Sequence, residues 1–449
     1  QVNFMQQPKE KYSLWTAIAM ILGIVIGSGI FFKGDNILVY TEGNILYGVL
    51  VFVIGAIAII FGGLSIGELA ARTNLPGGLV TYANTFIGHR IGCIFGWFQI
   101  FIYFPTLVAV VSWVVGIYMS ILFGWKTTLE GQILIGFGFF TFTFLLNTFS
   151  ARLGGYFQTT ATVIKLIPLF LIAVLGLIFG DPAMAIPKEA VESVQSFSWL
   201  MAIGPIAFSY DGWIVSTSIS HEIKNAKVNL PRALTIAPIF VLITYVLYFV
   251  GISVLVGPDR VVEMGDAHVY YAAEQIAGYW GAKAILIFII VSVMGTVNGL
   301  VLGYIRLPYS LALLQMFPYA EIVQKIHPKY ETPVYAALIA FVISVIWTII
   351  HYITQKFNLL PNSDVSEISV AITYVLLAVL YIKVIQMYKR KEIIGKIRGI
   401  FNPIMAILGS GIVLLGGMQI PLFVYYGFFC ILVMIGAVIY YQRTIQNQK

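Results

Sequence analysis

Long runs of apolar residues recur along the whole chain, separated by short polar segments. The runs cover residues 13–38, 44–70, 87–123, 131–149, 156–180, 198–219, 233–256, 282–316, 333–353, 365–388, 400–418 and 421–442. A helix that crosses a bilayer needs about 20 mostly apolar residues, because the hydrocarbon core is about 30 Å thick. The pattern therefore predicts an all-α membrane protein with about twelve transmembrane helices.

The composition agrees with this interpretation. Of the 449 residues, 59% are hydrophobic and 10% are charged, against about 25% charged residues in soluble domains. A water-soluble fold has no core large enough for so much apolar surface. The two cysteines, Cys93 and Cys430, both lie inside apolar runs and form no disulfide or metal-binding pattern. We expect no metal and no cofactor.

The basic residues predict the orientation in the membrane. An even number of spans places both termini on one side, and cytoplasmic loops carry an excess of Lys and Arg. With the termini inside, most of the basic residues fall in inner loops or tails. Lys165 lies inside the membrane, and the outer connections hold only Lys33, Lys126, Lys188, Arg260, Lys283 and Lys356. The chain is therefore expected in the plasma (inner) membrane, with residues 1–12 as a cytoplasmic tail. The net charge of +7 follows from the same rule, so we expect membrane lipids and no nucleic acid as partners.

Two spans contain sequence that interrupts a helix. The first span contains Gly27-Ser28-Gly29, and the sixth contains Phe208-Ser209-Tyr210-Asp211-Gly212-Trp213. Unwound backbone at membrane depth is tolerated where it lines a cavity. A half-helix that begins near Gly29 would direct free backbone N–H groups into that cavity, which suits a carboxylate. Half-helices that end there offer carbonyls to an ammonium group, so both ends together suit a zwitterion. Each motif alone is equally compatible with a close packing contact between two helices.

The position of the two breaks suggests how the chain is organised. They lie five spans apart, as expected of an inverted repeat with a site at the bilayer midplane. The predicted architecture is a five-plus-five inverted repeat with broken first and sixth helices, followed by two extra C-terminal helices. The repeats would cover residues 13–180 and 198–388, and the extra helices residues 400–442.

Lys165 and Asp211 are ionisable residues at membrane depth. Lys165 lies well inside the fifth span, where a lysine costs about 3 kcal/mol and must face protein. It is either a fixed cation that hydrogen-bonds the unwound first span or a structural lysine between helices. Asp211 either faces a substrate amine or caps the half-helix that follows it.

Other membrane-protein classes fit the sequence less well. A channel needs a polar lining on several spans, and here the spans offer chiefly Lys165 and Asp211. An enzyme needs clustered His, Asp, Glu or Cys. The five histidines are scattered along the chain without a catalytic motif: His89, His221, His268, His327 and His351. We therefore expect a protein that is not an enzyme.

Four motifs in order resemble the amino acid–polyamine–organocation superfamily, and within it the L-type amino-acid transporters, especially bacterial members. The first motif is Gly27-Ser28-Gly29-Ile30-Phe31. The others are listed in chain order: Gly67-Glu68-Leu69 with Pro76-Gly77-Gly78 and Tyr82; Phe208 to Trp213 with Glu222, Asn225 and Asn229-Leu230-Pro231-Arg232-Ala233; and Val297-Asn298-Gly299 with Arg306, His327-Pro328 and Thr332-Pro333. Val80 and Ile305 depart from the usual residues at their positions without affecting the resemblance.

The resemblance implies roles for individual residues. The substrate-binding residues would be Ile26, Gly27, Ser28, Gly29, Ile30, Phe208, Ser209, Tyr210, Asp211 and Gly212. Backbone at Ser28–Ile30 would hold the carboxylate, carbonyls near Ile26 and Phe208 would take the amine, and Phe208 would also be an outer gate. Lys165 would stand where sodium lies in sodium-coupled relatives and contact the first span and the eighth near Gly295. Tyr245 would connect this lysine with the substrate region.

The resemblance also implies a function. We expect a sodium-independent exchanger of small neutral amino acids such as alanine, serine, threonine or cysteine, working by alternating access. The alternative is a proton-coupled symporter of cationic or neutral amino acids, because Asp211 could pair with a cationic side chain. The connection 123–131 has no cysteine, whereas eukaryotic relatives bond a glycoprotein there, so no disulfide-linked heavy subunit is expected.

Overall fold

The described part of the chain is mostly helical. The computed structural model describes residues 13–448 except 74, 76–77, 187–197 and 215–222, and these residues form helices without a β-strand. Ten segments among them are long and apolar enough to cross a bilayer: Ile45–Ala70, His89–Phe123, Leu129–Phe149, Leu153–Phe179, Lys227–Val256, Pro258–Leu313, Val334–Lys356, Val365–Lys389, Ile397–Met418 and Phe423–Thr444. The prediction of an all-α membrane protein is confirmed.

The first and sixth predicted spans are both interrupted. The first consists of α1 (Leu14–Val25), α2 (Gly29–Phe32) and α3 (Gly34–Tyr40). In the sixth, α12 (Ile203–Tyr210) follows a short 3-10 helix, Ser198–Ala202. Four apolar spans separate these two, four more follow α12, and two complete the chain, which is the predicted order.

Some residues named in the sequence analysis lie outside the described part. They are the tail 1–12, positions 215–219 of the predicted sixth span, Pro76, Gly77, Lys188, His221 and Glu222. The division into repeats at 13–180, 198–388 and 400–442 stays a prediction.

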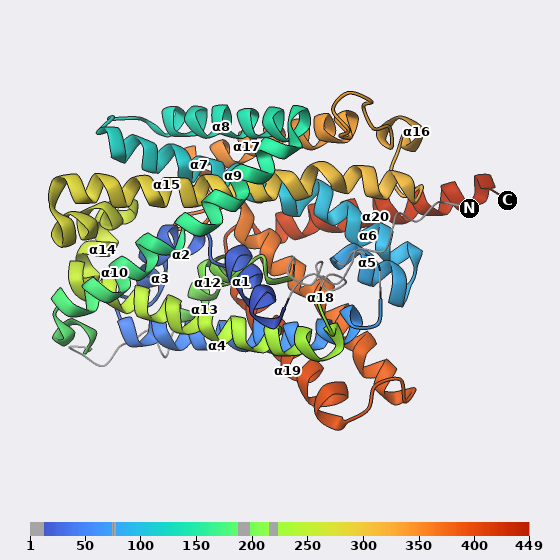
Figure 1. The fold of residues 1–449 in the computed structure, drawn as a ribbon, viewed down its shortest axis with the longest axis horizontal. Helices are drawn as coiled ribbons and strands as arrows, with labels where there is room; N and C mark the ends of the chain where they lie inside the picture. Colours follow the sequence, from blue (N-terminus) through green and yellow to red (C-terminus); the bar gives the residue numbers. More distant parts are fainter. Residues whose placement is uncertain (1–12, 74, 76–77, 187–197, 215–222, 449) are drawn as a thin grey trace.

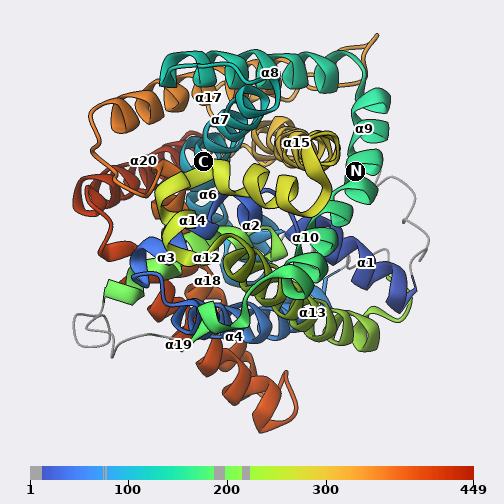
Figure 2. The same ribbon diagram turned by 90° about the vertical axis from the view of Figure 1, so that its left-hand side faces the viewer.

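The interrupted segments lie in the middle of the bundle. Figures 1 and 2 show α2 and α12 near the centre, with α4 (Ile45–Ala70) and α13 (Ala226–Val256) on one side and α7 (Phe104–Phe123) and α15 (His268–Leu313) on the other. Direct packing joins α12 to α2, α4 and α18 (Val365–Lys389). The unwound backbone is thus enclosed by protein, where neighbouring helices can satisfy its polar groups.

The remaining helices complete the bundle. They are α5 (Leu79–Tyr82), α6 (His89–Phe98), α8 (Leu129–Phe149), α9 (Ala151–Ile164), α10 (Leu166–Phe179), α14 (Pro258–Met264), α16 (Ala320–Val323), α17 (Val334–Lys356), α19 (Asn402–Met418) and α20 (Phe423–Gln448). The outermost of them present large apolar side chains at the surface, among them Val163 on α9 and Val424, Tyr425 and Phe428 on α20. Apolar side chains on that scale at the surface suit contact with lipid tails.

Small residues allow close helix packing, as is usual in membranes. On α10 and α13, Gly176 and Gly251 face each other so closely that a Cβ at Gly176 would lie 2.6 Å from the Gly251 carbonyl oxygen. This contact holds the fifth predicted span against the seventh. It fixes the position of the turn at Lys165, which directly precedes α10.

Part of the basic segment 383–398 is paired within the protein. Arg398 donates to Glu68 over 2.6 and 3.0 Å, and Arg72 donates to the same carboxylate over 2.7 Å. Glu68 belongs to α4, so the ion pairs join the end of that helix to the segment before α19.

Candidate functional site

The first helix break leaves backbone donors without partners. α1 ends at Val25 and α2 begins at Gly29. Within the described residues, the amides of Ser28, Gly29 and Ile30 make no hydrogen bond, although all three residues are buried. Buried N–H groups at the start of a helix require an acceptor, and they favour an anion. The predicted carboxylate position therefore has the right donors.

The carbonyl end of α1 is held by Lys165. The Lys165 ammonium donates to the Gly23 carbonyl oxygen, one of the last four carbonyls of α1, which have no partner inside the helix. Lys165 lies in the turn between α9 and α10 and is 5% exposed. A cation at the C-terminal end of a half-helix also interacts favourably with the helix dipole. The expected contact with the first span is present. Gly295 packs against Ala161, one turn before Lys165.

The second break follows α12. The helix ends at Tyr210, Asp211 has extended backbone, and Gly212 has a φ of +96°. Glycine adopts positive φ without the steric cost that a side chain imposes, so Gly212 allows the chain to leave the helix here. The Asp211 amide turns back to the Phe208 carbonyl over 3.1 Å.

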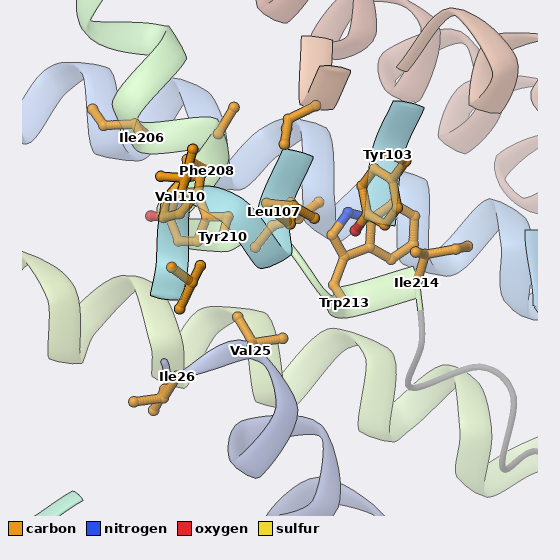
Figure 3. Packing of buried hydrophobic residues seen from close by; sticks show 14 of the residues in the cluster. Val25, Ile26, Tyr103, Leu107, Val110, Ile206, Phe208, Tyr210, Trp213 and Ile214 are labelled. Atoms are coloured by element: carbon orange, nitrogen blue, oxygen red, sulfur yellow. The ribbon is translucent and has the colours of Figure 1, made fainter. Parts of the chain in front are cut away.

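The two breaks are in direct contact. A Cβ at Gly29 would lie 2.7 Å from Ser209 Cα, so only glycine permits this approach of α2 to α12. Figure 3 shows Val25 and Ile26 on the segment of the first break and Phe208 and Tyr210 at the end of α12. The packing joins the start of one half-helix to the end of another, which is the arrangement that the zwitterion hypothesis requires.

Tyr245 connects the two broken helices. Its hydroxyl on α13 lies 3.1 Å from the Val25 carbonyl and 2.9 Å from the Ser209 carbonyl. One hydroxyl thus lies within hydrogen-bond distance of a carbonyl at the C-terminal end of α1 and of another at the C-terminal end of α12. The ring stacks on Tyr210 at a centroid distance of 5.5 Å.

Asp211 is paired with a neighbouring span. Its carboxylate accepts a hydrogen bond of 2.6 Å from the Tyr103 hydroxyl, and Tyr103 belongs to the helical turn just before α7. Residues 215–222 lie outside the described part of the chain, so the alternative that Asp211 caps a following half-helix stays a prediction. Asp211 lies beside the break and is half-buried as a whole residue.

Sequence reasoning missed a cluster next to Phe208. Lys33 was predicted to lie in an outer connection, and this prediction is wrong: Lys33 lies between α2 and α3, fully buried, with its ammonium 2.5 Å from Asp364 and 2.6 Å from Glu367. The lysine directly follows the Gly29–Phe32 helix, and the carboxylates stand at the start of α18. The available signal was a charge inside each of two apolar runs.

The described residues contain neither a cluster of metal-binding side chains nor a disulfide. No group of three or more His, Cys, Asp and Glu side chains there is arranged to hold a metal ion. Cys93 and Cys430 are both free and buried. The chemistry of the site is therefore that of backbone groups, hydroxyls and the charges already described.

Comparison with known proteins gives a consistent result. The sequence model of the amino acid permease family matches residues 12–449. The chain is 32% identical over 413 residues to the serine/threonine exchanger SteT of Bacillus subtilis (strain 168), which covers 90% of each protein. It is 24% identical over 446 residues to the b(0,+)-type amino acid transporter 1 of Mus musculus, covering 96% of this chain and 87% of the relative. It is also 26% identical to the human cystine/glutamate transporter over 344 residues, covering 74% and 66%.

Proposed function

This chain belongs to the amino acid permease family, and we propose that it is a sodium-independent exchanger of small neutral amino acids such as serine, threonine, alanine or cysteine. The observation that carries the proposal is the group of three buried amides at Ser28–Ile30, which have no hydrogen-bond partner in the described part of the chain and lie against the end of α12. The similarity to a serine/threonine exchanger over nearly the whole chain supports the choice of substrate.

The substrate carboxylate would accept hydrogen bonds from the amides of Ser28, Gly29 and Ile30. The substrate amine would donate to the carbonyls of Ile26 and Phe208. The Ile26 carbonyl makes no hydrogen bond within the described residues, and the Phe208 carbonyl bonds the Asp211 amide but keeps a second lone pair. A bound zwitterion would therefore complete polar groups that the protein leaves unpaired at this depth.

Lys165 would replace a coupling ion. Its ammonium would place a positive charge that belongs to the protein at the Gly23 carbonyl, where a mobile cation would otherwise be needed to balance the end of α1. Together with Tyr245 and Gly295 it would couple the first span to the fifth, seventh and eighth. A carrier with a fixed cation at this position has no need of sodium.

Transport would follow from movement of the broken helices. Phe208 would close the outer side over the substrate, and the substrate would favour reorientation by neutralising the half-helix ends. Exchange follows if the empty carrier reorients slowly. The protein would lie in the plasma (inner) membrane with both termini in the cytoplasm, surrounded by lipid and without a disulfide-linked heavy subunit.

The test is counterflow in proteoliposomes. Vesicles loaded with unlabelled serine should accumulate labelled serine from outside, equally in sodium and in choline buffer. A screen of all twenty amino acids as internal substrates then gives the selectivity. Accumulation that depends on sodium would refute the coupling, and the absence of counterflow for every neutral amino acid would refute the function.

The alternative function rests on Asp211. Its carboxylate lies at the break and bonds the Tyr103 hydroxyl at 2.6 Å, so it could take up a proton or pair with a cationic side chain. A proton-coupled symporter would accumulate substrate in response to an imposed pH gradient without internal substrate. Such uptake of lysine or arginine would favour this alternative over exchange.

A further inference from the structure

A buried ion cluster joins three of the elements that surround the proposed site. Lys33, between α2 and α3, donates to Asp364 Oδ2 over 2.5 Å and to Glu367 Oε1 over 2.6 Å. The three side chains are 0%, 2% and 1% exposed. A Cβ on Gly204 of α12 would lie 2.9 Å from Glu367 Oε2. The cluster therefore connects the outer half of the first span to α18 and to the broken sixth span.

Each carboxylate of the cluster has further donors. The Ser366 amide donates to Asp364 Oδ1 over 2.9 Å, the Ser366 hydroxyl also donates to that oxygen, and the Ser363 hydroxyl donates to Glu367 Oε2 over 2.8 Å. The carboxylates are thus preorganised on α18, and the lysine comes from a different part of the chain. Burying such charges is expensive, and a well-packed apolar contact would hold the helices together at least as strongly. What charges add is reversibility, because water can solvate each partner once the helices separate.

The cluster lies directly against Phe208. The Lys33 ammonium is 4.6 Å from the centroid of the Phe208 ring and 4.8 Å from that of Phe32, and the two rings contact each other edge to face at 6.3 Å. A desolvated ammonium over an aromatic face is attracted by the ring electrons. The lysine can take this position because Asp364 and Glu367 hold it from the other side.

We propose that Lys33 is a positioning residue of the outer gate: held by Asp364 and Glu367, it keeps Phe208 closed over the substrate, and it separates from α18 when the site opens to the outside. The inference rests on the proposed function for the direction of transport and for the gate role of Phe208. Beyond the proposed function, it names the elements that close the gate, which are the segment of Lys33 and α18, and the contact that must break, which is that of Lys33 with Asp364 and Glu367.

The test compares neutralising variants in proteoliposomes. Lys33→Met alone leaves two buried carboxylates unpaired and can impair folding, so it is combined with Asp364→Asn and Glu367→Gln, which removes every charge of the cluster. Lys33→Arg keeps the positive charge. The matched control is Lys356→Met, which removes an equally short ion pair, that of Lys356 with Glu130 at 2.5 Å, whose side chains are 48% and 40% exposed.

Opening is measured with a cysteine at Ser369, in a protein whose native cysteines are replaced by serine. Ser369 lies two residues after Glu367 on α18, is fully buried and hydrogen-bonds Thr106 over 2.9 Å. A membrane-impermeant maleimide reaches it from outside only when the outer side opens. We expect the triple variant to be labelled about 10-fold faster than the parent, in the range typical of coupling between two states, with Lys33→Arg and Lys356→Met close to the parent.

Kinetics separate gating from general damage. A carrier that rests open to the outside binds external serine more readily and closes less readily, so both KM and kcat should fall in the triple variant. Labelling and KM both unchanged in the folded triple variant would overturn the proposal. Slower turnover without faster labelling would assign the cluster a merely structural role and would overturn it too. Labelling needs no transport, so wild-type counterflow tests the proposed function separately.

Discussion

Tyr245→Phe removes a single oxygen atom that connects the two broken helices. In the wild type the hydroxyl lies 3.1 Å from the Val25 carbonyl and 2.9 Å from the Ser209 carbonyl. The ring stays in the variant, so its stacking on Tyr210 at 5.5 Å is kept. The change therefore tests the hydrogen bonds alone.

The size of the effect follows from the groups left unpaired. One hydroxyl proton serves one carbonyl at a time, so the variant loses one buried hydrogen bond, and leaving a buried acceptor unsatisfied costs about 1–3 kcal/mol. If that free energy stabilises the arrangement that binds substrate, exchange at low serine concentration should fall about 5- to 150-fold. The loss should appear mainly in the apparent affinity, because the carbonyl ends of α1 and α12 form the amine side of the site.

The control variant comes from the same helix. Tyr248→Phe removes a hydroxyl that is equally buried but has no hydrogen-bond partner in the described part of the chain. The Tyr248 ring packs edge to face on Phe31 at 5.3 Å, and this contact is kept. Removing an unpaired hydroxyl costs little, so this variant should exchange serine like the wild type.

The assay is counterflow of labelled serine, with each variant reconstituted at equal amounts after size-exclusion chromatography. Equal activity of Tyr245→Phe and wild type would refute the reasoning, because the bridging hydroxyl would then have no part in the site. An equal loss in both variants would also refute it, because the effect would then come from the aromatic environment on α13 and not from the bridge.

Three more predictions concern the same region, each with its own comparison. Lys165→Met should abolish most serine exchange because the Gly23 carbonyl loses its cation. The control Lys283→Met removes a lysine that donates to the Leu122 carbonyl away from the breaks, and it should retain exchange. Equal losses in counterflow would contradict the role of Lys165. Gly29→Ala should abolish binding of labelled serine in scintillation proximity measurements, since its Cβ would meet the Ser209 backbone at 2.7 Å, while Gly138→Ala, with open space around it, should bind normally. Asp211→Asn keeps an acceptor for the Tyr103 hydroxyl and should preserve serine exchange in counterflow at every pH; a loss confined to pH-driven uptake would support the proton-coupled alternative instead.

The helical segments could be predicted closely because hydropathy is a local property. The run 44–70 became Ile45–Ala70 and the run 365–388 became Val365–Lys389. The break in the first span was also predictable, since glycine lowers the cost of leaving the helix at Gly27–Gly29. The position of Lys165 inside an apolar run indicated that it must have a protein partner, and the Gly23 carbonyl is that partner.

The ion cluster of Lys33, Asp364 and Glu367 could not be predicted in the same way. Lys33 is separated from Asp364 by 331 residues and from Glu367 by 334, and no local pattern says that the start of α18 packs against the first span. A lysine near the outer end of a span was therefore interpreted as an outer-connection residue. The bridge by Tyr245 is similar, because a tyrosine in an apolar helix is equally compatible with any neighbouring helix.

The amino-acid sequence by itself determined the membrane environment, the number and order of the spans and the two points at which helices break, because each depends on apolar content and backbone freedom over about 20 residues. Only the tertiary structure decided which groups meet at those points. Helix packing selects one rotation for each span, and that choice places the Tyr245 hydroxyl between two carbonyl ends and Lys33 between two carboxylates and the Phe208 ring.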